Sequence, residues 1–309
     1  MFYLATHATR YRYEASVAHS LSETRLVPRS HAGQKLHQHE LEIHPEPANV
    51  EQRIDYFGNQ VASISIFRSH TEFSVTATSV VELLDATPEK GPPAPWEQVH
   101  DRMRAPEAEE DIRASEFLHD SPHVQADPLL AAFARTCFPP HQDVREGARE
   151  LCSRIHREFR YQPDSTSIDT PVLEVLERRA GVCQDFAHLM IGALRSLGLP
   201  ARYVSGYLRS GANYQGAEAS HAWVSVYVPG SGWLDFDPTN NVAPALAHVT
   251  LAWGRDYSDV PPTKGVSLGG GRQTVEVEVR VRPVHPSEIR LPMDGGSAPS
   301  ASSQAGFRR

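Results

Sequence analysis

The chain has 309 residues, 40% of them hydrophobic, and its 38 acidic side chains outnumber 30 basic ones to give a formal net charge of -8. This length suits two modest domains or one domain with large additions. No block of Lys and Arg is present, which argues against nucleic-acid binding because a basic patch has to neutralise phosphates. No stretch approaches the roughly 18 consecutive apolar residues of a transmembrane helix, and the first residues lack the basic and apolar regions of a signal peptide. We therefore expect a cytoplasmic protein that makes no membrane contact.

Residues 1–88 carry the pattern of an antiparallel β-sandwich. Short runs alternate between apolar and polar side chains with a period of two, and turn residues separate them. The runs lie at residues 9–17, 38–43, 61–67 and 71–77. We expect an N-terminal β-sandwich domain over residues 1–88, which offers a surface for binding a partner.

The composition changes after residue 88. A Pro-rich break at residues 91–96 and a charged stretch at 101–112 predict a solvated, irregular linker, helical in part, over residues 89–125. Asp127 followed by Pro128 predicts a helix N-terminus.

A second helix and a closing strand complete the expected core, residues 126–285. Apolar residues recur at helical spacing over residues 143–159. Residues 273–282 alternate strictly, so that Val275, Val277, Val279 and Val281 share one face of a strand. Residues 286–309 are rich in Gly, Ser, Ala and Pro, and we expect a disordered tail there.

The chain contains three cysteines, Cys137, Cys152 and Cys183. A low, odd number predicts reduced thiols and not a disulfide framework. No Cys-x-x-Cys pair occurs, so we expect no zinc site, no other metal and no cofactor. A free cysteine is most often a small buried core residue, and this is our interpretation of Cys137 and Cys152, which lie inside helical patterns.

Cys183 is the candidate nucleophile. From this residue onward apolar side chains recur at helical spacing until Gly198 and Pro200 end the helix. Cys183 therefore lies at or near a helix N-terminus, where free N–H groups and the positive end of the helix dipole favour an anion. Such a position favours the nucleophilic thiolate over the thiol.

His221 and Asp237 are the candidate base and orienting acid. His221 begins an alternating strand, and a Pro-Gly-Ser-Gly turn at residues 229–232 leads into a returning strand that ends at Asp237. Antiparallel pairing about this turn brings the two residues to nearly the same level. A helix N-terminus against that sheet edge would present Cys183 to the other imidazole nitrogen, as in a nucleophile, base and acid triad. Asp235 lies on the same side of the strand and remains a rival acid.

At these residues the sequence resembles the transglutaminase-like superfamily, whose core has a papain-type fold. The matching blocks are residues 181–187 (Gly-Val-Cys-Gln-Asp-Phe-Ala) with 199–207, residues 220–224 (Ser-His-Ala-Trp-Val), and residues 232–240, which end in Phe-Asp-Pro-Thr-Asn. The family's catalytic Cys, His and Asp fall on Cys183, His221 and Asp237, which favours Asp237 over Asp235. Residues 251–262 and 269–271, with the N-terminal strands, are similar to the bacterial two-domain branch.

The resemblance implies an α+β fold in which a papain/transglutaminase-like core follows the N-terminal β-sandwich domain. In that core a helix bearing the Cys packs on an antiparallel sheet. The resemblance also implies acyl transfer on amide bonds through a thioester. We favour hydrolysis of a peptide or amide bond, by a cysteine peptidase or amidase acting on a peptide or protein, because water is always available.

Three other hypotheses remain. The same residues would serve a protein-glutamine transglutaminase, in which an amine replaces water. A non-catalytic peptide-binding scaffold is the second, and it is weakened by the presence of all three residues. A metal-dependent hydrolase is the third, and no His-Glu-x-x-His motif supports it.

The oxyanion donors are not readable from the sequence. By analogy with thiol hydrolases, the backbone N–H of Cys183 is a candidate. Gln184 and Trp223 are candidates for a second donor or a substrate contact. Each also has a plain structural interpretation, Gln184 as a surface helix residue and Trp223 as a packing aromatic.

Overall fold

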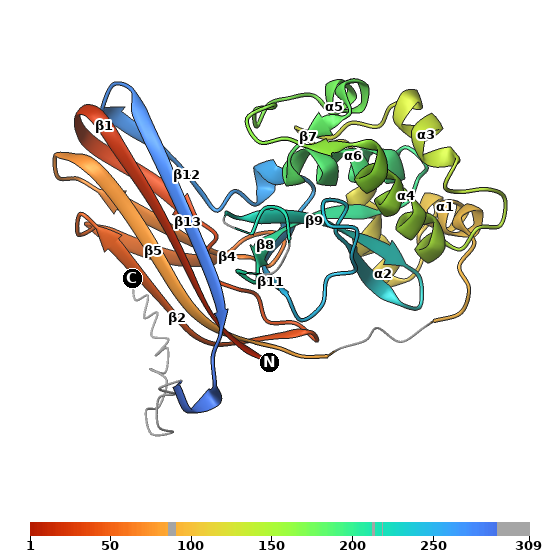
Figure 1. Ribbon diagram of the computed structural model, residues 1–309, viewed down its shortest axis with the longest axis horizontal. Helices are drawn as coiled ribbons and strands as arrows, with labels where there is room; N and C mark the ends of the chain where they lie inside the picture. Colours follow the sequence, from red (N-terminus) through yellow and green to blue (C-terminus); the bar gives the residue numbers. More distant parts are fainter. Residues whose placement is uncertain (86–90, 212–213, 218, 289–309) are drawn as a thin grey trace, which may run out of the picture.

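A computed structural model describes residues 1–85, 91–211, 214–217 and 219–288 of the chain. Figure 1 shows a long, curved antiparallel sheet beside a mixed unit of helices and a smaller sheet. The tail that we predicted to be disordered lies outside the described residues from 289 onward, and its first residues, Pro286–Glu288, form a short 3-10 turn, η3. None of the described helices combines the length and the apolarity needed to cross a bilayer.

The large sheet has seven strands. Five come from the N-terminal region: β1 (Phe2–Thr24), β2 (Gln34–His44), β3 (Asn49–Ile54), β4 (Gln60–Ile66) and β5 (His70–Leu83). They pair in the order β2-β5-β1-β4-β3. The strand-rich N-terminal region expected from the alternating runs is therefore confirmed.

Strand β1 holds the two halves of this sheet together. Its first half pairs with β5, its last residues pair with β4, and the register shifts between Arg12 and Val17. Such an irregularity bends a strand and increases its twist. The sheet consequently curls (Figure 1), and its two halves remain hydrogen-bonded through a single continuous strand.

The closing strands join the N-terminal sheet and not the core sheet, which corrects our grouping of residues 273–282 with the core. Both β12 (Thr263–Gly269) and β13 (Gln273–Pro283) pair antiparallel with β1, on the edge opposite β4 and β5. Side-chain alternation identifies a strand and its apolar face, but it carries no information about which distant strand will be the partner. The first and the last strands of the described chain therefore belong to the same sheet.

The segment that we predicted to be a solvated linker, helical in part, contains helices that pack against the core. It forms α1 (Trp96–Arg104), α2 (Glu109–Ser115) and the 3-10 turn η1 (Glu116–Leu118). Val99 and Met103 are buried on α1. On α2 the buried carboxylate of Asp111 accepts a hydrogen bond of 2.9 Å from the hydroxyl of Tyr227. Charged residues dominate these helices by number, and a few apolar side chains on one face are enough to dock them.

The core unit holds the remaining elements. They are α3 (Pro128–Arg135), α4 (Val144–Glu158), β6 (Arg160–Tyr161), α5 (Val172–Arg178), β7 (Ala180–Gly181), α6 (Cys183–Arg195), β8 (Ala201–Leu208), β9 (His221–Val228), β10 (Gly232–Phe236), β11 (His248–Gly254) and η2 (Tyr257–Asp259). The start of α3 is as predicted, because Asp127 accepts a hydrogen bond from the N–H of Leu129 and Pro128 is the first helical residue. Strands β10-β9-β8-β11 form an antiparallel sheet.

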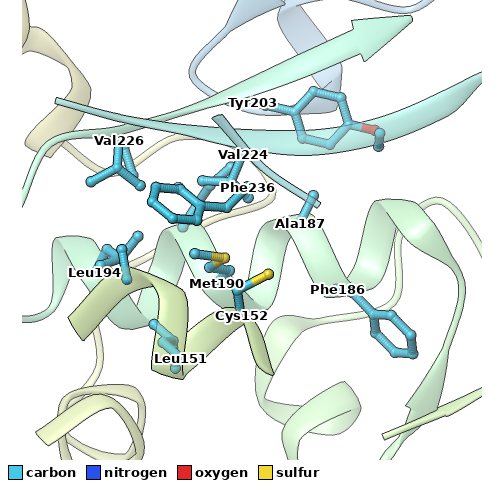
Figure 2. Close-up of a cluster of buried hydrophobic side chains, with 14 of the residues drawn as sticks. Leu151, Cys152, Phe186, Ala187, Met190, Leu194, Tyr203, Val224, Val226 and Phe236 are labelled. Atoms are coloured by element: carbon cyan, nitrogen blue, oxygen red, sulfur yellow. The ribbon is translucent and has the colours of Figure 1, made fainter. Parts of the chain in front are cut away.

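Helix α6 is the centre of this unit. Every residue from Asp185 to Arg195 is buried. Figure 2 shows Met190 and Leu194 of α6 between the sheet side chains Val224 and Phe236 on one side and Cys152 of α4 on the other. A helix buried all round is held rigidly, because interiors are packed as densely as organic crystals. Its first residue, Cys183, is therefore fixed relative to the sheet.

Two side-chain amides join the N-terminal sheet to the core sheet. Gln34 donates to the carbonyl of Thr250 and accepts from its N–H, both at 2.8 Å. Asn59 does the same for Trp253, donating at 2.9 Å and accepting at 3.0 Å. Both amides satisfy the outer edge of β11, where a strand otherwise presents unpaired backbone groups. These bonds help set the position of the curved sheet relative to the core.

Candidate active site

Cys183 is the first residue of α6, as the sequence predicts, and its side chain is half-buried. The helix starts here because the carboxylate of Asp185 accepts a 2.7 Å hydrogen bond from the N–H of Val182. Thr166 donates to the same carboxylate at 2.6 Å. The N–H groups of the first turn of α6 have no partner within the helix, so they offer positive charge density beside the sulfur.

His221 and Asp237 meet as the hairpin register predicts. His221 begins β9 and Asp237 follows β10. Val224 and Phe236 are paired across the two strands, a register that continues to Asp237 opposite Trp223, two residues from His221. The Nε2 atom of His221 lies 2.9 Å from Oδ2 of Asp237, and neither side chain has any exposed surface. The pair is therefore a buried hydrogen bond between an imidazole and a carboxylate.

Asp237 is held as a carboxylate by several donors. Its Oδ1 accepts from the backbone N–H groups of Thr239 and Asn240 at 2.9 and 3.2 Å, and its Oδ2 accepts from the side-chain amide of Asn240 at 2.9 Å. Burial favours the neutral acid, but the charges and hydrogen bonds of His221 and His248 outweigh it and hold the pKa of Asp237 well below its usual range.

The imidazole of His221 is held as its cation by the same contacts. Burial lowers the pKa of His221, but the charge and hydrogen bond of Asp237, together with the nearby Cys183, outweigh burial and raise the pKa to about 10. Because Nε2 is hydrogen-bonded to Asp237, Nδ1 is the ring nitrogen that is left to face the thiol. In the described part of the chain this buried atom has no nitrogen or oxygen partner.

A short stretch of loop covers the imidazole on its Nδ1 side. Gly216 has a φ of +82°, and a side chain there would begin 3.0 Å from Nδ1 of His221 and 3.5 Å from the hydroxyl of Tyr161. Burial and the nearby Cys183 raise the pKa of Tyr161 to about 12. Only glycine leaves this space free and adopts that backbone conformation without strain.

The other candidates from the sequence lie differently. Asp235, the rival acid, accepts a hydrogen bond of 3.2 Å from the indole N–H of Trp223. That bond occupies the only donor of Trp223, whose ring stacks beside His221, so the structure does not bring this donor to Cys183. The side-chain amide of Gln184 donates to the carbonyl of Ile168 at 3.2 Å. The N–H groups at the start of α6 remain the candidate oxyanion donors beside the sulfur.

His248 was missed by the sequence analysis. It begins β11, it is buried, and its Nε2 lies 3.2 Å from the same Oδ2 atom of Asp237 that faces His221. The signal was a histidine at the start of a mostly apolar strand, and it was hidden among 16 histidines. Ligand atoms of His221, Asp237 and His248 lie within 4.8 Å of one another, a spacing that a metal ion could also use.

Comparisons with known proteins found family matches for both parts of the chain. Residues 3–82 match the bacterial transglutaminase-like N-terminal region, and residues 131–238 match the transglutaminase-like superfamily. An uncharacterized protein of Mycobacterium tuberculosis is 36% identical over 295 residues, which cover 91% of this chain and 92% of the relative. An uncharacterized protein of Mycobacterium leprae is 33% identical over 284 residues, covering 89% of this chain and 96% of the relative.

Two further similarities concern named proteins. A protein-glutamine gamma-glutamyltransferase of Pseudomonas aeruginosa is 38% identical over 130 residues, which are 39% of this chain and 20% of that protein. A crystal structure from Cytophaga hutchinsonii, provisionally named a cysteine protease, superposes with a TM-score of 0.71 at 22% identity, over 91% of this chain and 90% of that one. The structural likeness confirms the predicted fold class.

Proposed function

This chain belongs to the transglutaminase-like superfamily, with the bacterial N-terminal region ahead of the core, and from that membership we propose that it hydrolyses a peptide or amide bond through a thioester on Cys183. The observation that carries the proposal is the buried 2.9 Å contact between His221 and Asp237, with Nδ1 of the imidazole on the side of the thiol. That is the arrangement of an activated nucleophile.

The first half of the reaction transfers the acyl group to sulfur. The Cys183 thiolate attacks the carbonyl carbon, and the resulting oxyanion meets the N–H groups at the start of α6. The C–N bond then breaks, and the proton on Nδ1 of His221 goes to the leaving amine. A thioester remains on Cys183.

The second half returns the enzyme to its starting state. A water molecule gives a proton to Nδ1 of His221 and attacks the thioester. The C–S bond breaks, its electron pair returns to the sulfur, and the carboxylic acid leaves. Asp237 keeps the imidazole oriented through Nε2 in both halves and stabilises its positive charge.

A second candidate function differs only in the acceptor. In a protein-glutamine transglutaminase an amine attacks the thioester, and a new amide replaces the acid. The name of the Pseudomonas aeruginosa protein favours this outcome for the matched part of the core. A non-catalytic scaffold would need none of the three side chains.

The proposal is tested by reacting the protein with iodoacetamide across pH and locating the label by peptide mass spectrometry. Burial raises the pKa of both Cys137 and Cys152, which therefore serve as internal controls. Cys183 should be labelled at least roughly tenfold faster than either at neutral pH. His221→Ala should remove this advantage, while His119→Ala, at an exposed histidine, should not. Equal labelling of all three thiols would refute the proposal.

The acceptor is then identified with acyl-donor peptides in the presence of a primary amine. Hydrolysis yields the free acid, and transamidation yields the amide of the added amine, which is heavier than the free acid by the mass of the amine minus that of water. An excess of amine adduct over acid would decide for the transglutaminase.

A further inference from the structure

One half of the valine face of β13 is only partly covered in the described structure. Val279 and Val281 are 3% and 1% exposed and belong to the main hydrophobic core. Val275 and Val277, on the same face of the same strand, are 48% and 44% exposed. Exposed apolar residues that continue a buried face are unusual in a solvated strand and often mark a binding surface.

Val275 and Val277 line a cavity of about 520 Å³ between the curved sheet and the core unit. We call it the sheet-side cavity. Its sheet side includes the aromatic rings of Tyr11, Tyr13 and Phe73, and its core side includes Tyr257 and Ile168. This volume is within the range of small-ligand pockets, which are lined mainly by apolar and aromatic side chains.

The sheet-side cavity adjoins the candidate active site. Ser220, in its lining, immediately precedes His221. Ile168, also in its lining, accepts a hydrogen bond from Gln184, the residue that follows Cys183. The backbone N–H of Tyr257 donates to His188 of α6 at 3.2 Å. A peptide whose carbonyl lies at Cys183 therefore has this cavity within reach of a neighbouring side chain.

The sheet-side cavity is lined mainly by uncharged side chains. Its described lining contains no carboxylate and no arginine, and its one lysine, Lys264, is half-exposed and lies 3.7 Å from the carboxylate of Glu23, which Arg53 also contacts. Burial lowers the pKa of His7 to about 4, so this imidazole is neutral at neutral pH. A basic side chain placed here would lose its hydration without meeting a carboxylate, and an acidic one would meet only the half-exposed Lys264, whereas an apolar ring would pack on the valines and aromatic rings.

We propose that the sheet-side cavity binds an uncharged aromatic or large aliphatic side chain of the acyl-donor peptide, so that the N-terminal sheet selects the substrate of the core. The inference rests on the proposed function, because the reaction at Cys183 fixes where the peptide lies relative to the cavity. It also gives the strand pairing of β1 with β12 and β13 a role beyond stability, since these strands present Val266, Val275 and Val277 to the substrate.

The test compares two kinds of alkylating probe on the full-length protein. Iodoacetamide carries no side chain and reports the thiol alone. Peptidyl chloromethyl ketones on an alanine background carry Phe, Asp or Lys at each of four positions in turn. The rate of each probe is divided by the rate of iodoacetamide on the same protein. At one of the four positions this ratio should be roughly tenfold higher for the Phe probe than for the Asp and Lys probes.

Two matched variants connect this preference to the cavity. Val277→Asp places a carboxylate in the cavity at an exposed strand position, and Leu268→Asp places one on the neighbouring strand β12 outside its lining. Val277→Asp should abolish the preference for Phe and shift it toward Lys. Leu268→Asp should keep the wild-type preference, which controls for the general effect of an added charge.

The two proposals fail in different ways. Rapid labelling by iodoacetamide without a preference for Phe at any position would overturn the cavity proposal and leave the nucleophile intact. A Cys183 that iodoacetamide does not label selectively would overturn the proposed function. In that case fluorescence polarisation of a labelled Phe-containing peptide amide still tests the cavity, because binding that is not weakened by Val277→Asp would refute it.

Discussion

Nε2 of His248 lies 3.2 Å from Oδ2 of Asp237, the oxygen atom that also faces the candidate base. A carboxylate buried this completely needs donors on every side, because each missing hydrogen bond leaves part of its charge without compensation. His248 is therefore a positioning residue: it acts on His221 through the shared carboxylate.

Replacement of His248 tests this role. His248→Ala should lower the free energy of unfolding by about 1.5–3 kcal/mol at pH 7, since a buried charged acceptor loses a donor. His248→Gln, which retains an N–H donor, should recover part of the loss. Urea denaturation measures both, and an alanine variant as stable as the wild type would contradict the role.

The pH profile of stability separates this role from simple packing. The pKa of Asp237 is depressed, so its contribution is present above the unfolded value of about 3.9 and is lost as pH falls through the lower folded value. Removing the donor from His248 raises the folded pKa, and the acid loss of the alanine variant should begin at higher pH than in the wild type. A purely steric defect would lower stability equally at pH 4 and pH 7.

The identity of the acid is tested by a matched pair of amide substitutions. Asp237→Asn should slow alkylation of Cys183 by roughly a hundredfold or more, because the amide no longer stabilises the imidazolium or fixes its orientation. Asp235→Asn, two residues away on the same side, should change the rate only a few-fold, since Asp235 bonds to Trp223. The reverse order of the two effects would assign the role to Asp235.

Part of this site follows from local rules. The helix that begins at Cys183 and the strand that begins at His221 are confirmed, because periodicity and turn residues encode both. The proximity of His221 to Asp237 is also confirmed, since a short hairpin sets the register of its two strands. The reaction, its peptide substrate and a cytoplasmic location stay predictions.

The rest of the site depends on long-range contacts that no local pattern carries. His248 reaches Asp237 only because β11 pairs with β8, on the far side of the core sheet from β10. The valine face of β13 is plain in the sequence, but its pairing with β1 spans most of the chain. The sequence pattern indicated which face of the strand carries Trp223, but it did not indicate which group accepts the indole hydrogen bond. The bond to Asp235 was therefore not predicted.

The raised pKa of His221 predicts how stability changes toward alkaline pH. Its folded pKa of about 10 exceeds the ordinary value of 6.5. The contribution of the His221–Asp237 pair is therefore complete below pH 6.5 and is lost as pH rises through about 10. The difference in unfolding free energy between wild type and His221→Gln should shrink over this interval, measured by urea denaturation. A difference that stays constant would mean that His221 is neutral when folded.

The amides that join the two sheets give a prediction about the fold. Asn59→Ala should leave the N–H and carbonyl of Trp253 without partners and lower the free energy of unfolding by about 1–3 kcal/mol. Asn49→Ala, at an exposed position of β3, should change it by less than about 0.5 kcal/mol.

Because the sheet-side cavity lies between the two units, Asn59→Ala should also weaken the preference for aromatic probes while leaving labelling by iodoacetamide less affected. Urea denaturation measures the first effect, and the comparison of peptidyl probes with iodoacetamide measures the second. A destabilised variant that keeps the full preference for aromatic probes would show that the Asn59 hydrogen bonds do not shape the cavity.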